Sequence, residues 1–380
     1  MNKTQLLENW NAFKENRPHT KGLYAKRNWG SSLHSLCSYQ GKLKPALAYQ
    51  LVKNFSNEGD LVLDPFSGSG TIPFEAAMNN RRAIGFDISD MSVAISNGKI
   101  KHTTEAGCEK VINDLERYFS KNSVSEKSKK DAVEVAFNKN ISDYFEPETL
   151  EEILKARDFF IQTKNFNDAN WCLVFSSMLH ILHGNRPYAL SRRSHPLTPY
   201  APTGEYERKP VIKHLSDKVF KSVSEKRRLI LSEANCFQQD ILGTWDKSVK
   251  GVNAIITSPP FVASTKFYMT NWMRFWFAGW GKEDFQNAIV DFVEVKQKKD
   301  INVYRSIFTK FNEVLVDDGI VLLHVGKNKS LNMGEVLCEI AKDFFEVCDL
   351  FVEDSEDFEK HGLKDKGGTT QHQYLLLRKL

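Results

Sequence analysis

The stretch from residue 61 to residue 87 constrains the fold of this chain more than any other part of it. Residues 61–64 form a short apolar run that ends on an acid, and a Gly-rich turn follows at residues 65–70. Residues 72–78 are helix-like, and residues 82–87 form a second apolar run that again closes on an acid. A strand, a turn, a helix and a strand in this order predict a parallel βαβ unit, whose ligands bind at the carboxyl ends of the strands.

The turn and the second acid predict a site for a nucleoside cofactor. Glycines allow a ligand to approach the backbone closely, and Asp87, at the end of the second strand, can bind both hydroxyls of a ribose. The pattern is not the dinucleotide fingerprint, because Pro73 stands where its third glycine would be, and no Gly-Lys-Ser/Thr follows to make a phosphate loop. A lone Gly-Ser-Gly is more often a flexible turn, so the interpretation depends on the order of the four elements.

A second motif, Ser258-Pro259-Pro260-Phe261, follows the apolar run 254–257. Two adjacent prolines fix φ at about −65° and remove two backbone donors, which leaves carbonyl oxygens to accept hydrogen bonds. The loop therefore offers acceptors and a flat ring, which suits holding an exocyclic amino group and stacking on its base. Ser-Pro-Pro also occurs in ordinary loops, so this motif gains weight only together with the first.

Both motifs resemble those of the site-specific DNA amino-methyltransferases. The family's Asp-Pro-Phe-x-Gly-Ser-Gly-Thr matches residues 64–71, and its Ser/Asp/Asn-Pro-Pro-Tyr/Phe matches residues 258–261. The resemblance implies transfer of a methyl group from S-adenosylmethionine to a base nitrogen, with the base flipped out of the duplex. The serine form, preceded here by Thr257, is usual for N4-methylcytosine, whereas Asp or Asn is usual for N6-methyladenine. This favours cytosine and leaves adenine as the alternative.

The resemblance also assigns residues to roles. It implies a catalytic loop made of Ser258, Pro259, Pro260 and Phe261. It implies cofactor contacts from Gly41, Lys42, Asp64, Pro65, Phe66, Gly68, Gly70, Thr71, Asp87 and Asp240. Gly41 and Lys42 belong to a segment, residues 34–47, that resembles the one closing over the methionine end, although a surface turn entering an amphipathic helix would look the same. Asp240 stands where the family places a contact to the adenine, and a helix N-cap or a solvated turn acid is the alternative.

The distribution of charge predicts a contact with nucleic acid. The net charge is only +4, but eleven basic residues and four acids lie between residues 181 and 230. Phosphate neutralisation supplies most non-specific DNA affinity, so this local excess predicts a footprint on duplex DNA. We expect Arg186, Arg192, Arg193 and His195 to touch DNA, because they stand in a Pro-interrupted loop rather than on a periodic face. For residues 213–228, a solvated helix face is the simpler interpretation.

The order of elements predicts an α/β fold, with a doubly wound, mostly parallel seven-stranded sheet of the Rossmann-like methyltransferase type and a largely helical insertion. Further strands are expected at 235–237, 254–257 and 320–325, with a final antiparallel pair at 345–352 and 374–377. Helices are expected at 111–119, 148–161, 171–182, 303–316 and 333–345, and an exposed loop at 120–130. Residues 1–90 would hold the cofactor half, 91–233 the insertion with the DNA-recognition region, and 234–380 the catalytic half. A lid or a dimerisation element is the alternative role for the insertion.

Several classes of protein are disfavoured. Six cysteines without paired spacing indicate neither a disulfide framework nor a zinc site, so no metal is expected. A polar start without an apolar signal core, and no apolar run of about 18 residues, predict a soluble, cytoplasmic protein. The resemblance is compatible with a companion restriction endonuclease, and the sequence does not indicate the oligomeric state. RNA base methyltransferases share the first motif but more often have Asp or Asn in the second. A non-enzymatic DNA-binding protein is disfavoured because both motifs are intact.

Overall fold

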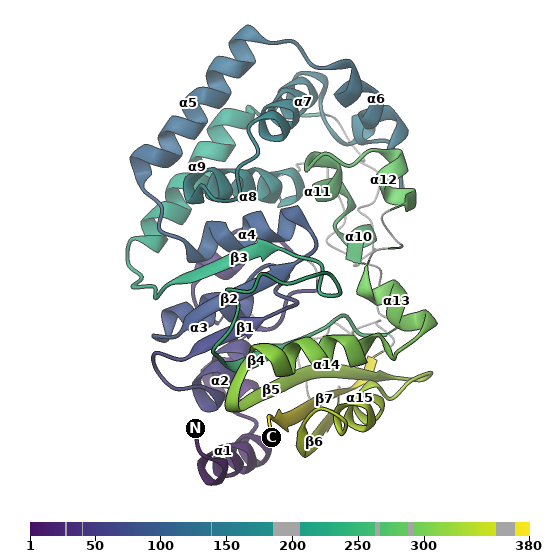
Figure 1. The fold of residues 1–380 in the computed structure, drawn as a ribbon. Helices are drawn as coiled ribbons and strands as arrows, with labels where there is room; N and C mark the ends of the chain where they lie inside the picture. Colours follow the sequence, from purple (N-terminus) through teal and green to yellow (C-terminus); the bar gives the residue numbers. More distant parts are fainter. Residues whose placement is uncertain are drawn as a thin grey trace.

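One sheet of seven strands organises the chain in the computed structural model, which describes residues 1–26, 29–39, 41–137, 139–184, 206–262, 267–287, 290, 292–354 and 369–380 (Figure 1). The strands are β1 (Leu61–Asp64), β2 (Arg82–Asp87), β3 (Ala234–Gln238), β4 (Val252–Thr257), β5 (Leu315–Asn328), β6 (Glu346–Asp354) and β7 (Thr369–Arg378). Their order is β3-β2-β1-β4-β5-β7-β6. Strands β1 to β5 run parallel, and β7 is antiparallel to both β5 and β6. The predicted fold class and the final antiparallel pair are therefore confirmed.

Helices connect and cover these strands. The helices before β3 are α1 (Lys3–Asn16), α2 (Pro45–Phe55), α3 (Thr71–Met78), α4 (Asp90–Ile100), α5 (Glu105–Lys121), α6 (Glu126–Glu134), α7 (Pro147–Gln162), α8 (Ala169–Gly184) and α9 (Val211–Lys226). Those after β4 are α10 (Phe267–Thr270), α11 (Trp272–Phe277), α12 (Lys282–Asn287), α13 (Val293–Lys299), α14 (Val303–Val314) and α15 (Met333–Ala341). Short 3-10 turns lie at η1 (Pro18–Thr20), η2 (Gly22–Ala25), η3 (Ser32–Ser35) and η4 (Ile141–Tyr144). None of the described helices has the length and apolarity that a membrane crossing requires.

Both faces of the sheet are buried. Successive residues of a strand point to opposite faces, so each strand supplies two cores. Val62 and Leu322 belong to a cluster with α1, α2 and α3, whereas Leu63 and Leu323 belong to one with α14 and α15. Burial on both faces explains why residues 254–257 read as a continuous apolar run rather than an alternating one.

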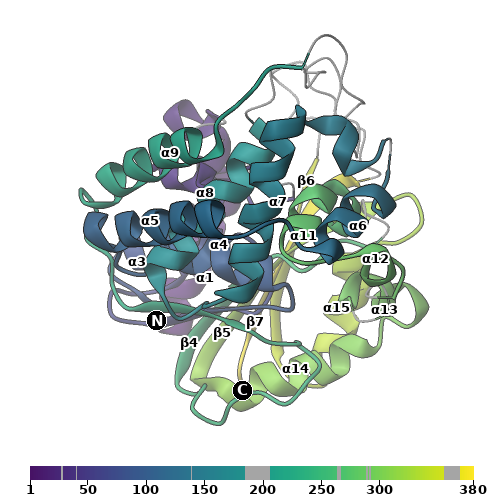
Figure 2. The same ribbon diagram turned by 90° about the horizontal axis from the view of Figure 1, so that it is seen from above.

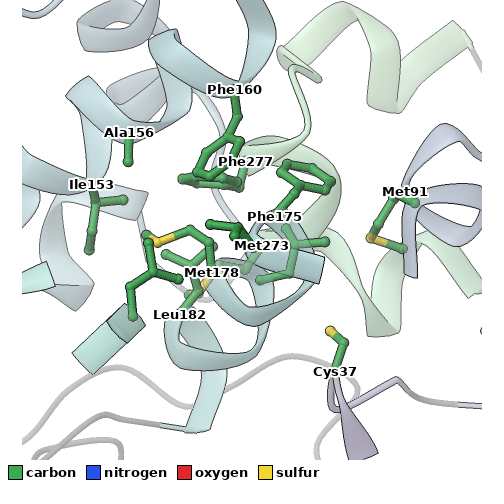
Figure 3. Packing of buried hydrophobic residues seen from close by; sticks show 14 of the residues in the cluster. Cys37, Met91, Ile153, Ala156, Phe160, Phe175, Met178, Leu182, Met273 and Phe277 are labelled. Atoms are coloured by element: carbon green, nitrogen blue, oxygen red, sulfur yellow. The ribbon is translucent and has the colours of Figure 1, made fainter. Parts of the chain in front are cut away.

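A third hydrophobic cluster lies in the helical segment between β2 and β3. Helices α5, α7, α8 and α9 lie beyond the β3 edge of the sheet, and α4 contacts both β3 and α8 (Figures 1 and 2). Figure 3 shows Phe160 of α7, Phe175 of α8 and Phe277 of α11 converging in this cluster. The buried Arg157 guanidinium of α7 donates to the Trp276 carbonyl at 2.8 Å and pairs with Asp131 of α6 at 2.6 Å. The helical segment therefore has its own core, shared with a helix that follows the catalytic loop.

The structure corrects the loop predicted at 120–130. Helix α5 continues to Lys121, and α6 begins at Glu126 with the Ser125 side chain accepting from the Ser128 backbone N–H. Asp158 of α7 accepts from the hydroxyls of Ser125 and Ser128 at 2.7 and 2.6 Å. The Lys- and Ser-rich composition of this stretch indicated a loop. Asp158, whose carboxylate bonds the two serine hydroxyls, lies about thirty residues further along the chain, so nothing local in the sequence indicated it. Several bounds also differ: α5 begins at Glu105, α15 ends at Ala341, β5 begins at Leu315 and β7 begins at Thr369.

Candidate active site

The carboxyl ends of β1 and β4 lie side by side at the point where the strand order reverses. Val62 pairs with Ala254 and Leu63 with Ile255, so the ends of both strands meet at one edge of the sheet. Ligands of open α/β sheets bind at such a reversal. The Asp64 carboxylate accepts a hydrogen bond of 2.6 Å from the Thr257 hydroxyl. One side-chain hydrogen bond thus joins the two sequence motifs.

A pocket at this edge collects residues from three separate segments. Of the predicted cofactor residues, it contains Gly41, Lys42, Asp64, Phe66, Gly68 and Thr71, and Ser258 of the catalytic motif lies on the same wall. Tyr39, Leu43, Ser67, Ser69 and Ile72 complete the lining. Pro65 and Gly70 lie in the same turn without lining the pocket. The structure therefore brings the segment around residue 41, the Gly-rich turn and Ser258 together.

The Gly-rich turn requires glycine at residue 70. Gly68 and Gly70 have φ of +50° and +71°, in the left-handed region that L-residues with a side chain avoid. A Cβ at residue 70 would lie 2.6 Å from the Ser96 hydroxyl oxygen of α4, closer than real contacts allow. The Ser96 hydroxyl in turn donates to the Gly68 carbonyl at 3.0 Å. Helix α4 thus holds the turn close, and the pocket wall is backbone rather than side chain.

Asp87 ties the end of β2 to this turn. One carboxylate oxygen accepts from the Gly68 backbone N–H at 3.0 Å, and the other accepts from the Ser89 backbone N–H at 2.8 Å. Burial raises the pKa of Asp87 to about 6 despite these hydrogen bonds. A carboxylate has about four acceptor positions, so two bonds leave capacity for further donors. Its place beside the turn suits the role predicted from the sequence.

Other polar groups around the pocket were missed by the sequence reasoning. The Tyr39 hydroxyl lies 2.9 Å from the Ser92 hydroxyl of α4, and the buried Lys99 ammonium donates to the Ser69 carbonyl. Burial lowers the pKa of Lys99 to about 7 and raises that of Asp64 to about 7. No local pattern singles these residues out, because each acts through a partner from a different part of the chain.

The catalytic loop is fastened at three points. The Ser258 hydroxyl lies 3.0 Å from Nδ1 of His324, and the Gln297 amide donates to the Pro260 carbonyl at 2.8 Å. The Asn328 amide donates to the Val262 carbonyl. The half-buried Phe261 ring meets the His324 ring edge-on, with centroids 5.4 Å apart. These contacts give the loop the rigid path expected from its two prolines, and they give Phe261 a packing role beside the predicted stacking role.

Several predicted residues do not line the pocket, and four more lie outside the described residues. Those that do not line it are Pro65, Gly70, Asp87, Asp240, Pro259, Pro260 and Phe261. Asp240 does not line the pocket, and its side chain accepts from the Leu242 backbone N–H at 2.9 Å, as a turn acid does. Its contact to an adenine stays a prediction. Arg186, Arg192, Arg193 and His195 lie outside the described residues.

Part of the basic excess between residues 181 and 230 is used within the molecule. Arg208 pairs with Glu148 and Glu152 of α7 at 2.8 and 2.5 Å. The buried Lys226 ammonium donates to the Gly98 carbonyl at 2.7 Å, and Arg227 pairs with Glu105 at 2.5 Å. These cations contribute less to a DNA footprint than their number suggests.

Comparisons with known proteins agree with this geometry. Residues 2–98 match the sequence profile of the family described as DNA methylase, of the N6/N4 type. The chain is 48% identical over 56 residues to the orphan methyltransferase M.BamHII of Bacillus amyloliquefaciens, an alignment that covers 15% of this chain and 21% of that protein. It is 30% identical over 103 residues to the type II methyltransferase M.MjaII of Methanocaldococcus jannaschii, covering 26% and 19% of the two chains. It is 34% identical over 85 residues to the type II methyltransferase M.HpaI of Haemophilus parainfluenzae, covering 21% and 27%.

Residues 2–98 are therefore similar to the DNA amino-methyltransferases of the N6/N4 type. The chain spans about a fifth to a quarter of the length of these relatives, and the matches do not distinguish the N4 type from the N6 type. This similarity implies S-adenosylmethionine as the cofactor, and the pocket and the residues beside it fit its chemistry. In the pocket, Lys42 can pair with the carboxylate of the methionine end and Asp64 can accept from its ammonium. Asp87 does not line the pocket, but it is bonded to the Gly68 N–H of the turn and can accept from the ribose hydroxyls.

Proposed function

We propose that this chain transfers a methyl group from S-adenosylmethionine to the N4 amino group of a flipped-out cytosine in duplex DNA. The observation that carries this proposal is the single pocket in which the Gly-rich turn and Ser258 meet. The hydrogen bond between Asp64 and Thr257 fixes that meeting at the ends of two adjacent strands. N6-adenine methylation is the alternative, and the serine at residue 258 supports cytosine.

The cofactor half of the pocket is proposed to bind and orient the donor. Asp87 would hold the ribose hydroxyls while the Gly68 to Gly70 backbone lies against the methionine portion and Phe66 packs near the sulfonium. S-adenosylmethionine supplies a methyl group on a positively charged sulfur. The half-buried Phe66 ring offers an apolar, electron-rich surface at that place.

The catalytic half is proposed to hold the base. A base inside a duplex cannot reach the pocket, so it must be flipped out, at a cost of a few kcal/mol. Phe261 would stack on it, while the Ser258 side chain and the Pro259 carbonyl accept hydrogen bonds from the amino group. These bonds would orient the nitrogen lone pair toward the methyl group, so that alignment provides most of the acceleration.

The cysteines support direct transfer to nitrogen rather than a route through a thiolate. Cys108, Cys172 and Cys236 are buried, and burial raises the pKa of each thiol to about 12. A catalytic thiolate requires a lowered pKa in an accessible site. Methylation of carbon 5 through one of these three thiols is therefore disfavoured.

Mass spectrometry of nucleosides tests the function. The chain would be incubated with S-adenosylmethionine and either duplex DNA or tRNA, with Ser258→Ala as the matched control. We expect N4-methylcytosine in the DNA and none with the control. Detection of N6-methyladenine in the DNA would establish the alternative product. Detection of a methylated base only in the tRNA would show that the substrate is RNA and not DNA. No methylated base in any sample would refute the proposal.

The DNA contact is tested separately with Arg192→Ala/Arg193→Ala. If both arginines neutralise phosphates, the slope of log affinity against log salt should fall by up to roughly two units. If one reads a guanine instead, the loss should concentrate on the cognate site and amount to about 1–3 kcal/mol of discrimination. The control is Arg305→Ala, which removes an exposed arginine paired with Asp343. The same affinity and slope in wild type and double variant would place the recognition surface elsewhere.

A further inference from the structure

An imidazole chain leads away from the catalytic serine. The Ser258 hydroxyl lies 3.0 Å from Nδ1 of His324, and Nε2 of His324 lies 3.0 Å from Nδ1 of His372. The two imidazole rings are stacked, with an interplanar angle of 12°. Neither histidine belongs to a motif that the sequence analysis singled out.

Three adjacent strands supply the members of this chain. Ser258 directly follows β4, His324 lies on β5, and His372 lies on β7. In the sheet, β5 has β4 on one side and β7 on the other, so the three side chains follow one another across it. His324 is buried and His372 is half-buried. The chain therefore runs from the catalytic pocket toward the surface.

The groups around His324 keep it neutral. Burial and the neighbouring imidazoles of His372 and His19 lower the pKa of His324 well below its usual value. Glu353, which is paired with His372 in the register of β6 and β7, accepts from the Tyr374 hydroxyl at 2.9 Å and lies 3.1 Å from Nε2 of His19. A neutral imidazole has one nitrogen that donates and one that accepts. His324 can therefore take a proton on one side while it gives one up on the other.

We propose that Ser258, His324 and His372 form a proton path that removes the amino proton of the target base as the new N–C bond forms. This inference rests on the proposed function. Ser258 is the catalytic residue of the path, and the two histidines act through it as positioning and proton-carrying residues.

The amino nitrogen uses its lone pair to form the N–C bond, and the electron pair of the breaking C–S bond stays on sulfur. The nitrogen, now positively charged, gives its proton to the Ser258 oxygen, which passes its own proton to Nδ1 of His324. His324 passes the proton on Nε2 to Nδ1 of His372, and half-buried His372 gives a proton to solvent.

The chemistry of serine explains why such a path is useful. A carboxylate in the first position of the motif could hold the proton itself, whereas a neutral hydroxyl accepts a proton only if it loses one at the same time. An adjacent base must then be available to take that proton. His324 occupies that position, at hydrogen-bond distance from the only hydroxyl of the motif.

Single-turnover methylation by three variants tests the path. His324→Asn retains an amide that can bond to Ser258 but cannot pass a proton on. His372→Ala removes the half-buried end of the path. His102→Ala, an exposed histidine elsewhere on the surface, is the control. Dissociation constants for cofactor and DNA are measured alongside, with thermal unfolding to verify the fold.

We expect the first two variants to bind cofactor and DNA as wild type does and to transfer at least roughly tenfold more slowly, since general-base assistance is typically worth about 10²–10⁴-fold. Added imidazole should restore part of the rate of His372→Ala, and His102→Ala should match wild type. A wild-type rate in His324→Asn would show that the bond to Ser258 only orients the hydroxyl, and would overturn the path. So would a wild-type rate in His372→Ala, or a slow rate that imidazole leaves unchanged. An inactive wild type would instead refute the proposed function.

Discussion

Replacement of Asp87 by alanine is the sharpest test of the cofactor site. The Asp87 carboxylate closes the end of β2 and already accepts from the backbone N–H groups of Gly68 and Ser89. If it also accepts from both ribose hydroxyls, Asp87→Ala removes two hydrogen bonds to a charged acceptor. Each such bond is worth about 1.5–3 kcal/mol, so we expect a loss of about 3 kcal/mol. That corresponds to a Kd for S-adenosylmethionine that is weaker by roughly a hundredfold.

The same substitution should leave the fold near native. It leaves the backbone N–H groups of Gly68 and Ser89 without their hydrogen-bond acceptor, at a cost of about 1–3 kcal/mol each. It also removes an acid whose pKa burial raises from 3.8 to about 6. At neutral pH an acid with a raised pKa destabilises the folded state, by about 1.4 kcal/mol per unit. The two effects have opposite signs and similar sizes, so the thermal midpoint should change little.

Titration calorimetry with S-adenosylmethionine measures the affinity directly. Asp90→Asn is the matched control, because Asp90 lies three residues further on and pairs with Lys164 rather than with the turn. Its affinity should stay close to that of wild type. Ribose hydroxyls donate to the ionised carboxylate, so wild-type affinity should fall as the pH drops below about 6, and Asp87→Ala should lose that dependence. Unchanged affinity in folded Asp87→Ala would refute the ribose contact.

Three further predictions address the loop, the turn and a buried acid. If the Phe261 ring stacks on the base, Phe261→Ala should retain its affinity for the cofactor but raise the barrier to methyl transfer by about 1–3 kcal/mol. A wild-type rate in this variant would mean that the ring only packs against its neighbours. Gly70→Ala should weaken both the stability of the fold and cofactor binding. The control is Gly59→Ala: Gly59 has a φ of +83° and a Cβ there would meet no atom within 4 Å, so this variant should lose only about 1–2 kcal/mol of stability. Equal behaviour of the two variants in both assays would contradict the crowding at the turn. Burial raises the pKa of Glu75 to about 8, so the folded state prefers the protonated acid. The free energy of unfolding of the wild type should therefore fall as the pH rises from about 4.5 to about 8. Denaturant unfolding of Glu75→Gln should show no such fall in stability.

The parts of the fold that were predicted correctly are those that local sequence specifies. The β1–β2 unit follows from two apolar runs around a Gly-rich turn, and the final antiparallel pair follows from apolar runs near the end of the chain. The placement of both motifs at the carboxyl ends of strands was also predictable, because parallel strands present their carboxyl ends at one edge. The bond between Asp64 and Thr257 was not, since nothing local indicates which strand lies beside β1.

Residues that act through distant partners could not be predicted. His324 and Gln297 look like ordinary strand and helix residues until the sheet places them against the catalytic loop. The prediction of a loop at residues 120–130 was wrong for the same reason. The Asp158 carboxylate bonds the hydroxyls of Ser125 and Ser128 and so holds the start of helix α6 against α7. Single-sequence patterns report the local preference, whereas these positions are decided by contacts between elements far apart in the chain.

The order of cofactor motif, helical segment and catalytic motif has a physical consequence. Helix α4 begins three residues after Asp87 and packs against α8, and α11, which follows the catalytic loop, packs in the same cluster. The helix that follows Asp87 and the helix that follows the 258–261 loop therefore pack in the same hydrophobic cluster. Helix α8 leads in sequence directly to the predicted DNA-contacting residues from Arg186 onward. A helical segment placed between the two motifs can thus hold the Gly-rich turn and the loop at residues 258–261 against one scaffold, and that scaffold leads in sequence to the predicted DNA-contacting residues.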